Sequence, residues 1–235
     1  MRYAIIAAGE GSRLSQEGVA VPKPLVKVGG ECLIDRLIRI FTENRATDIS
    51  VVCRPDKQVE NYLRLKQQGG VPIQYIVKST SSSMHSMYEL SSFIEGDEPF
   101  VLTTVDTVFS ESAFRAYVSA LEECLLLGEA DGLMGVTDYV DDESPLYVTV
   151  DEERNITAFL DRDDKPRYVS AGIYGLTPRS LSTLRNCIAR GEHRMRNFQR
   201  ALLADGLRLK AWPFGKVFDV DHAADVAKAD KFLSA

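Results

Sequence analysis

The chain has 235 residues, of which 45% are hydrophobic and 26% charged, and its formal net charge is −6. This length and composition are typical of a globular protein that buries a sizeable core without disulfides or a structural metal. The acidic balance argues against a general nucleic-acid binder, because such proteins are usually basic. A local basic pocket for a small phosphorylated ligand remains compatible with it.

The four cysteines are scattered, form no C-x-x-C pair and are accompanied by only three histidines. This pattern predicts free thiols, buried or half-buried, in a reducing compartment, and no zinc site. The apolar run at 3–8 is too short for a secretory signal or for a membrane span, which needs about 20 residues. We therefore expect a cytoplasmic protein, monomer or homodimer, with no membrane partner.

Strand and helix patterns alternate over the first 110 residues. Apolar runs typical of strands buried on both faces occur at 3–8, 49–53, 73–77 and 99–105. Helical spacing of apolar residues occurs between them at 33–42, 60–68 and 86–94. This alternation predicts a largely parallel sheet with helices on both faces.

The second half has a different order of elements. Strands are expected at 132–136, 146–150, 156–160, 169–176 and 207–214, the second and third of them forming a hairpin. Helices are expected at 113–127, 179–188, 195–205 and 223–233. Because no Pro-, Gly- or Ser-rich linker separates the halves, we predict one α/β domain over residues 1–235.

The most informative segment is Ala7-Ala-Gly-Glu-Gly-Ser-Arg-Leu14, where a buried strand runs into a loop with Gly9 and Gly11. Glycine lets the backbone approach a phosphate closely, and Arg13 can add a charge-assisted contact. The loop is not a P-loop, since no Gly-Lys-Ser/Thr follows, and Leu14 replaces the third glycine of the Rossmann fingerprint. A Gly-x-Gly by itself is also compatible with a plain tight turn.

Eight residues after Leu14 the chain reads Pro22-Lys-Pro-Leu25. The two prolines are expected to keep the backbone extended on either side of Lys23 and so to aim its ammonium. Apolar residues follow at once, which predicts that Lys23 lies at the edge of the core. The alternative is a solvated lysine in a proline-rich turn.

Together the two segments closely resemble the N-terminal motif of the nucleotidyltransferase family, which includes sugar-1-phosphate and phosphocholine nucleotidylyltransferases. The resemblance implies a three-layer α/β/α, Rossmann-like fold of the nucleotide-diphospho-sugar transferase type with a mostly parallel mixed sheet. It further implies that residues 1–110 bind an NTP, and that residues 111–235 bind an acceptor and supply a second metal ligand.

The resemblance also implies roles for individual residues. Gly9, Gly11, Ser12 and Arg13 would hold the triphosphate, and Lys23 would stabilise charge at the α-phosphate. Ala7 and Ala8 would lie alongside the base. Ser82, Ser83 and Ser86 fall in a polar stretch that resembles the base- and ribose-binding segment of choline-phosphate-like members, which usually carry Asn at 82 or 83. His85, in the same stretch, is expected to be a packing or loop residue.

Nucleotidyl transfer needs a divalent cation, normally Mg²⁺, held by hard oxygen ligands. The strand at 99–105 runs into Asp106, at the edge where open α/β sheets bind ligands. The resemblance assigns Asp106 to catalysis and metal binding, and places a second carboxylate near the C-terminus. Asp219 and Asp221 lie on one face if their segment is extended, so both stay candidates, with a helix cap as the alternative role.

The acceptor site is expected in the second half, where Phe159-Leu-Asp-Arg162 and the strand at 169–174 resemble the acceptor-binding region of sugar-nucleotide synthases. By this resemblance Asp161, Arg162 and Gly172 are candidate acceptor-binding residues.

The sequence is thus interpreted as a Mg²⁺-dependent nucleotidyltransferase. It would join an NTP, CTP or UTP, to a phosphorylated small-molecule acceptor, either a sugar-1-phosphate or a phosphocholine-like compound, and release pyrophosphate. No general base is expected, because the acceptor phosphate is already an anionic nucleophile. The alternatives are a glycosyltransferase of related fold, using Asp219-Val-Asp221 as its metal motif, and a catalytically inactive nucleotide-binding module.

Overall fold

The computed structural model describes residues 1–94, 96–140, 144–163 and 167–234, with a nine-stranded mixed sheet at the centre. Four parallel strands of the first half lie in the order β6–β1–β4–β5: β1 (Arg2–Ala7), β4 (Asp48–Cys53), β5 (Ile73–Val77) and β6 (Phe100–Thr104). The second half adds β8 (Gly132–Thr137), β9 (Tyr147–Val150), β10 (Ile156–Leu160), β11 (Tyr168–Leu176) and β12 (Leu209–Pro213). The mixed sheet predicted from the sequence is confirmed.

One strand, β11, joins the two halves of the sheet. It pairs antiparallel with β6 of the first half, and with β8 and β9 of the second. β12 lies parallel beside β8, and β10 forms the expected hairpin with β9. Since one sheet runs through both halves, we propose that residues 1–235 fold as one domain.

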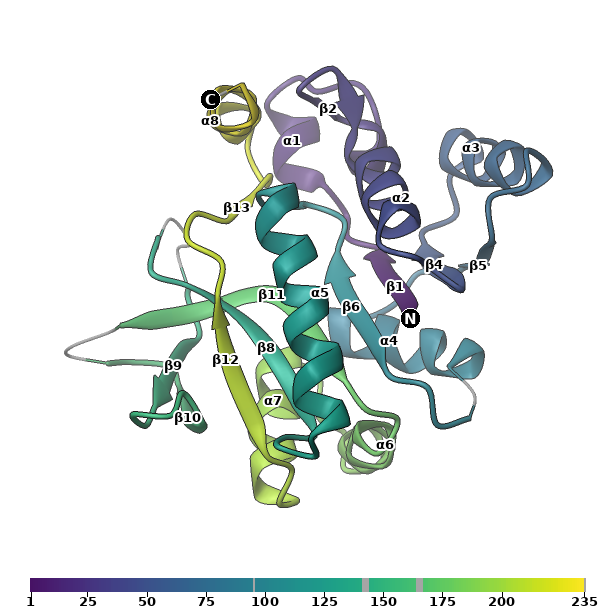
Figure 1. Cartoon of the computed structure of the whole chain (residues 1–235). Helices are drawn as coiled ribbons and strands as arrows, with labels where there is room; N and C mark the ends of the chain where they lie inside the picture. Colours follow the sequence, from purple (N-terminus) through teal and green to yellow (C-terminus); the bar gives the residue numbers. More distant parts are fainter. Residues whose placement is uncertain (95, 141–143, 164–166, 235) are drawn as a thin grey trace.

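Helices cover both faces of the sheet (Figure 1). One face carries α2 (Leu33–Glu43), α3 (Lys57–Gln68), α5 (Glu111–Leu126) and α8 (Ala223–Leu233). The other carries α4 (Ser83–Leu90), α6 (Ser180–Ala189) and α7 (Met195–Ala204). The predicted α/β/α layering is therefore present.

Strand β1 shows why the sheet is covered on both faces. Its side chains alternate, so that Tyr3 and Ile5 pack into one core cluster while Ala4 and Ile6 pack into the other. All four are buried, as expected for a run without polar positions.

Shorter elements surround the carboxyl ends of the parallel strands. They are α1 (Ser12–Gln16), a 3₁₀ turn at Lys23–Leu25, β2 (Lys27–Val28), β3 (Glu31–Cys32), β7 (Thr107–Val108) and β13 (Phe218–Asp219). A further 3₁₀ turn at Ser91–Phe93 directly follows α4. β13 pairs antiparallel with β7, which directly follows β6. This pairing brings the C-terminal aspartates close to Asp106, which lies in the turn between β6 and β7.

Two local expectations were wrong. The backbone is extended at Pro22, but Lys23–Leu25 form one 3₁₀ turn, closed by hydrogen bonds from Leu25 N to Pro22 O and from Val26 N to Lys23 O. The helix expected at 86–94 begins earlier, at Ser83, because the Ser82 side chain caps it by accepting a hydrogen bond from His85 N. Part of the polar stretch that contains Ser82, Ser83 and Ser86 is therefore helical.

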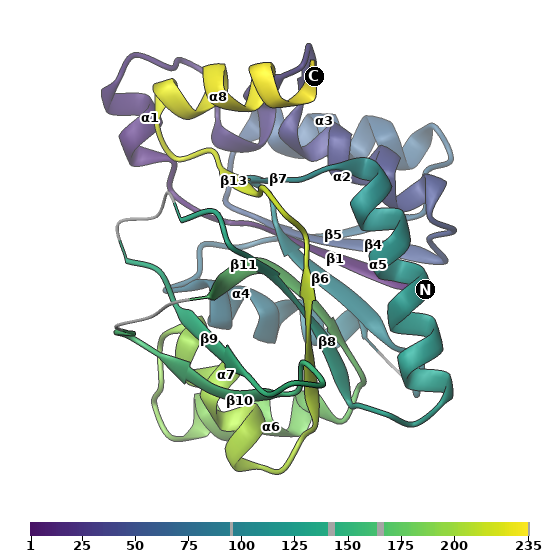
Figure 2. The same cartoon turned by 60° about the vertical axis from the view of Figure 1, so that its left-hand side comes forward.

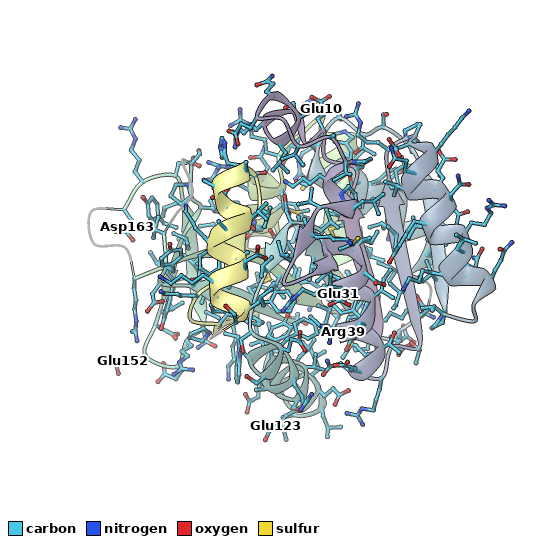
Figure 3. The ribbon with its side chains drawn as sticks, turned by 90° about the horizontal axis from the view of Figure 1, so that it is seen from above. Glu10, Glu31, Arg39, Glu123, Glu152 and Asp163 are labelled. Carbon is cyan, nitrogen blue, oxygen red and sulfur yellow. The ribbon has the colours of Figure 1, made fainter. Side chains whose placement is uncertain are left out.

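Acidic side chains are numerous at the periphery of the molecule. Figure 3 shows this for Glu10, Glu123, Glu152 and Asp163. In the same view Glu31 lies beside Arg39, whose guanidinium also donates to Glu111 and so ties β3, α2 and α5 together. The negative net charge is thus carried largely at the surface.

The four cysteines are free, and three of them are buried, as predicted. Among the described helices, none has the length and the apolar character needed to cross a bilayer.

Candidate active site

The ammonium group of Lys23 lies between two carboxylates. Its Nζ donates to Asp106, and it lies 2.6 Å from Oδ1 of Asp221. The Lys23 side chain is only 7% exposed, whereas those of Asp106 and Asp221 are 20% and 43% exposed. The structure therefore brings together one cation and two carboxylates that the sequence had singled out separately.

The glycine loop and Lys23 are in direct contact. Gly11 has a φ of +60°, and a Cβ on this residue would lie 3.0 Å from Cβ of Lys23. Position 11 thus requires glycine for its backbone conformation and for the close approach of Lys23. Gly11 also precedes α1, which carries Arg13 to within 3.4 Å of Asp221. Ser12, the first residue of α1, is exposed.

The charges of Lys23, Asp106 and Asp221, which we call the trio, stabilise one another. Burial by itself would lower the pKa of the Lys23 ammonium, but the attraction of Asp106 and Asp221 outweighs it and raises that pKa. Burial would likewise raise the pKa of Asp106, but the nearby Lys23 charge holds it below its usual value. Both groups are charged at neutral pH.

The two C-terminal aspartates, left as alternatives by the sequence, have different partners. Asp221 contacts Lys23 and Arg13. Asp219 accepts a hydrogen bond from Thr107 Oγ1 at 3.3 Å, within the β7–β13 pair. Asp221 therefore shares the partner Lys23 with Asp106.

A cavity of about 300 Å³ opens between the glycine loop and the segment 80–86, and we call it the serine cavity. Its lining includes many of the expected nucleotide-binding residues together with Lys23 and Asp106: Ala8, Gly9, Ser82, Ser83 and Ser86. Within it, Ser86 is buried and shares a 2.6 Å hydrogen bond with Thr80. Ala7 and Gly11 line an adjoining cavity with Lys23.

Arg54 also lines the serine cavity, and sequence analysis missed it. It follows β4 directly and donates to Glu10 of the glycine loop at 3.0 Å. Its position directly after a predicted buried strand could have indicated it, since the carboxyl ends of neighbouring parallel strands meet at one edge of the sheet.

A second cavity of about 450 Å³, the arginine cavity, lies on the other side of the trio. Its polar lining includes Asp106, Asp219, Asp221, Ser82, Ser83, Thr104, Ser170, Tyr174, His193, Arg194, Arg196 and Gln199. The expected acceptor residue Gly172 lines it too, with a φ of +71° inside β11. Asp106, Thr104 and the two serines line both cavities, which therefore meet at Asp106, with Lys23 on the side of the serine cavity and Asp221 on the side of the arginine cavity.

The other two expected acceptor residues are placed differently. Asp161 is exposed and held by α7, with Arg196 at 2.5 Å and Arg200 at 2.8 Å. Hydrogen bonds from these arginines lower the pKa of its carboxyl, Arg200 having the larger effect. Arg162 is exposed beside it. Arg194 and Arg196 instead provide the guanidinium groups of the arginine cavity.

His85, expected to be a packing or loop residue, contacts Ser82 and His193. Its Nδ1 lies 2.9 Å from Ser82 Oγ, and its ring stacks on that of His193 with centroids 5.3 Å apart. The pair links the start of α4 to the segment that precedes α7.

Comparison with known proteins identifies the family. Residues 3–203 match the family described as MobA-like NTP transferase domain. The chain belongs to this family. This MobA-like domain is 28% identical over 194 residues to the mannose-1-phosphate guanyltransferase of Aspergillus oryzae. The aligned region covers 78% of this chain and 51% of that relative. The chain is also 28% identical over 157 residues to the CMP-5'-(3-aminopropyl)phosphonate synthase of Streptomyces rubellomurinus, covering 60% of this chain and 25% of that protein.

Solved structures confirm the fold of this MobA-like domain. The inositol-1-phosphate CTP transferase of T. maritima superposes with a TM-score of 0.81 at 22% identity, covering 100% of this chain and 95% of that one. A putative glucose-1-phosphate thymidylyltransferase of Bacillus anthracis gives 0.84 at 22% identity, with 99% and 94% covered. The expected nucleotide-diphospho-sugar transferase type of fold is thereby confirmed. The chain spans about half the length of the first curated relative it matches.

Proposed function

We propose that the chain is a Mg²⁺-dependent nucleotidyltransferase that joins an NTP to a phosphorylated small-molecule acceptor and releases pyrophosphate. The observation that carries this proposal is that Asp106 lines both the serine and the arginine cavity, and that Lys23, from the serine cavity, contacts both Asp106 and Asp221, which lines the arginine cavity. Two substrates bound on either side would bring their reacting phosphates together at this point, and such positioning supplies much of the catalysis in phosphoryl transfer.

Asp106 and Asp221 fit a divalent cation. Their oxygens converge on one atom, Lys23 Nζ, so they can also converge on a metal ion beside it. No cluster of three or more His, Cys, Asp and Glu suited to a metal occurs among the described residues. Mg²⁺ is often held by one or two carboxylates plus substrate phosphates. When bound here, it would neutralise phosphate charge and orient the triphosphate.

The chain's own residues would do the rest. The backbone of the glycine loop and Arg13 bind the triphosphate, and Lys23 stabilises the negative charge that develops at the α-phosphate. An acceptor phosphate oxygen bonds to the α-phosphorus while the bond from that phosphorus to the bridging oxygen breaks, and pyrophosphate leaves. The attacking oxygen carries no proton that must be removed, so no general base is required.

The lining of the arginine cavity favours a polyol phosphate over phosphocholine as the acceptor. Hydroxyl and amide groups of Ser170, Tyr174 and Gln199 suit a hydroxylated ring, and Arg194 suits its phosphate. A choline group would call for aromatic faces around the cation. Tyr174 is the one Phe, Tyr or Trp side chain among the described lining residues.

The relatives support a pyrimidine or guanine nucleotide, and we favour CTP over UTP. Their names include a CTP transferase acting on inositol-1-phosphate and a CMP-phosphonate synthase. The free state of the four cysteines supports a reducing compartment such as the cytoplasm.

A pyrophosphate-release screen tests the proposal. The four NTPs are each combined with Mg²⁺ and with sugar-1-phosphates, inositol-1-phosphate or phosphocholine. We expect release with CTP and a polyol phosphate, and none without Mg²⁺ or without acceptor. Pyrophosphate release from no combination, together with no binding of Mg²⁺·NTP in calorimetry, would refute the enzyme assignment and favour an inactive nucleotide-binding module.

A further inference from the structure

The carboxylate of Glu17 holds the chain that follows Asp221. Its Oε1 lies 2.6 Å from Nδ1 of His222, and its Oε2 accepts a hydrogen bond of 2.6 Å from Ala223 N. Glu17 directly follows α1, and its own N–H donates to Arg13 O. Figure 2 shows the result, with α1 and α8 side by side.

The position of Asp221 depends on this contact because the sheet does not reach it. β13 ends at Asp219, and the next backbone bond to the first half runs from Val220 N to Asp106 O at 3.1 Å. The N–H of Asp221 itself donates to Asp225 in the first turn of α8, at 3.2 Å. The Asp221 carboxylate is therefore placed by the N-terminus of α8, and Glu17 fixes that N-terminus to α1.

The C-terminal end of α8 is held by a similar hydrogen bond between a carboxylate and a backbone N–H. Oδ1 of Asp230 accepts a 2.6 Å hydrogen bond from Gly29 N in the turn between β2 and β3. A Cβ on Gly29 would lie 3.2 Å from Leu233, so the helix packs closely there. Asp230 is a matched comparison for Glu17, since both carboxylates bind α8 to the first half but only Glu17 does so beside Asp221.

We propose that Glu17 is a positioning residue, which sets the Asp221 carboxylate against Lys23 and Arg13. One carboxylate thereby couples the helix that carries Arg13 to the segment that carries Asp221. The proposal rests on the proposed function for its consequence in turnover, but its geometric content concerns only where Asp221 is held and can be measured without turnover.

The test compares Glu17→Ala, Glu17→Gln and Asp230→Ala. Mn²⁺ binding is measured by electron paramagnetic resonance in the presence of the α,β-methylene analogues of the four NTPs, alongside thermal unfolding and steady-state kinetics. We expect Glu17→Ala to weaken Mn²⁺ binding and to lower kcat by about tenfold or more, the scale of lost supporting contacts at metal sites. KM for the acceptor should change little. Glu17→Gln, which still accepts from Ala223 N, should recover most of the loss.

The control separates positioning from stability. Asp230→Ala should lower the unfolding temperature about as much as Glu17→Ala while leaving Mn²⁺ affinity and kcat close to wild type. The proposal is overturned if Glu17→Ala binds Mn²⁺ as the wild type does, or if Asp230→Ala weakens binding equally. A wild type that binds Mn²⁺ but releases no pyrophosphate would refute the proposed function alone; one that binds no Mn²⁺ would overturn both.

Discussion

Lys23 and Asp221 are separated by 198 positions in the chain, yet Nζ of the lysine lies 2.6 Å from Oδ1 of the aspartate. The contact joins the N-terminal and C-terminal parts of the site, because Lys23 belongs to the turn after the glycine loop and Asp221 to the segment that follows β13. The ammonium group also stands where two carboxylates converge, the arrangement that a divalent cation would use.

Replacing Lys23 by Met should lower turnover by about a hundredfold or more, the scale seen when one preorganised donor to a transition state is lost. It should also leave Asp106 and Asp221 facing each other without a cation between them. Mg²⁺ should therefore raise the unfolding temperature of Lys23→Met more than that of the wild type, measured by calorimetry. Lys27→Met, at an exposed lysine nearby, is the control and should behave as wild type.

Asp219 and Asp221 should differ in importance. Asp221→Asn should reduce turnover and raise the Mg²⁺ concentration needed for half-maximal rate, because Asp221 shares Lys23 with Asp106. Asp219→Asn, which alters a contact to Thr107, should lose about tenfold less activity. Rates measured across a Mg²⁺ series compare the two, and a larger effect at Asp219 would contradict the assignment.

Arg194→Ala should raise KM for the phosphorylated acceptor by about ten- to hundredfold, since charge-assisted hydrogen bonds contribute about 1.5–3 kcal/mol. KM for the NTP should stay near its wild-type value, because Arg194 lines the arginine cavity. Arg185→Ala, at an exposed position on α6, is the matched control. Equal changes in both KM values would argue against an acceptor contact.

Asp161→Asn should destabilise the protein in a pH-dependent way. Arg200 and Arg196 hold the pKa of Asp161 below its ordinary value of 3.8. A lowered pKa in the folded state means that the stabilisation is present above the unfolded pKa and is lost as the pH falls through the folded one. Urea unfolding should thus show a difference between wild type and variant at neutral pH that disappears well below pH 3.8. A difference in unfolding free energy that stays the same across this pH range would contradict the prediction. A large rise in the KM for the acceptor in Asp161→Asn would instead support Asp161 as an acceptor ligand.

Gly172→Ala should destabilise the fold by about 1–2 kcal/mol through its positive φ, and further through contact. A Cβ there would lie 3.1 Å from Thr107 Oγ1. Gly128→Ala is the comparison, since Gly128 has a φ of +64° but no atom within 4 Å of the added Cβ. Urea unfolding should show a larger loss of unfolding free energy for Gly172→Ala than for Gly128→Ala. Equal losses would mean that the contact with Thr107 makes no contribution.

Much of the fold could be predicted from local pattern. The buried strand at 3–8, the amphipathic helix at 33–42 and the hairpin at 146–160 all lie within one or two residues of their observed bounds. Apolar periodicity depends only on residues close together in the sequence, so it can be recognised without a structure. The turn at Lys23 could not be read this way, because its 3₁₀ conformation is compatible with the same prolines as an extended chain.

The sequence by itself determined the glycine loop, the lysine that follows it and the aspartate at the end of a buried strand, because each is a short motif with its own local chemistry. Only the tertiary structure decided that Asp221 contacts Lys23, and that Arg54 and Arg194 line the two cavities. The physical reason is that convergence depends on the order of strands in the sheet and on where β13 ends. Those features arise from packing between segments up to about two hundred residues apart.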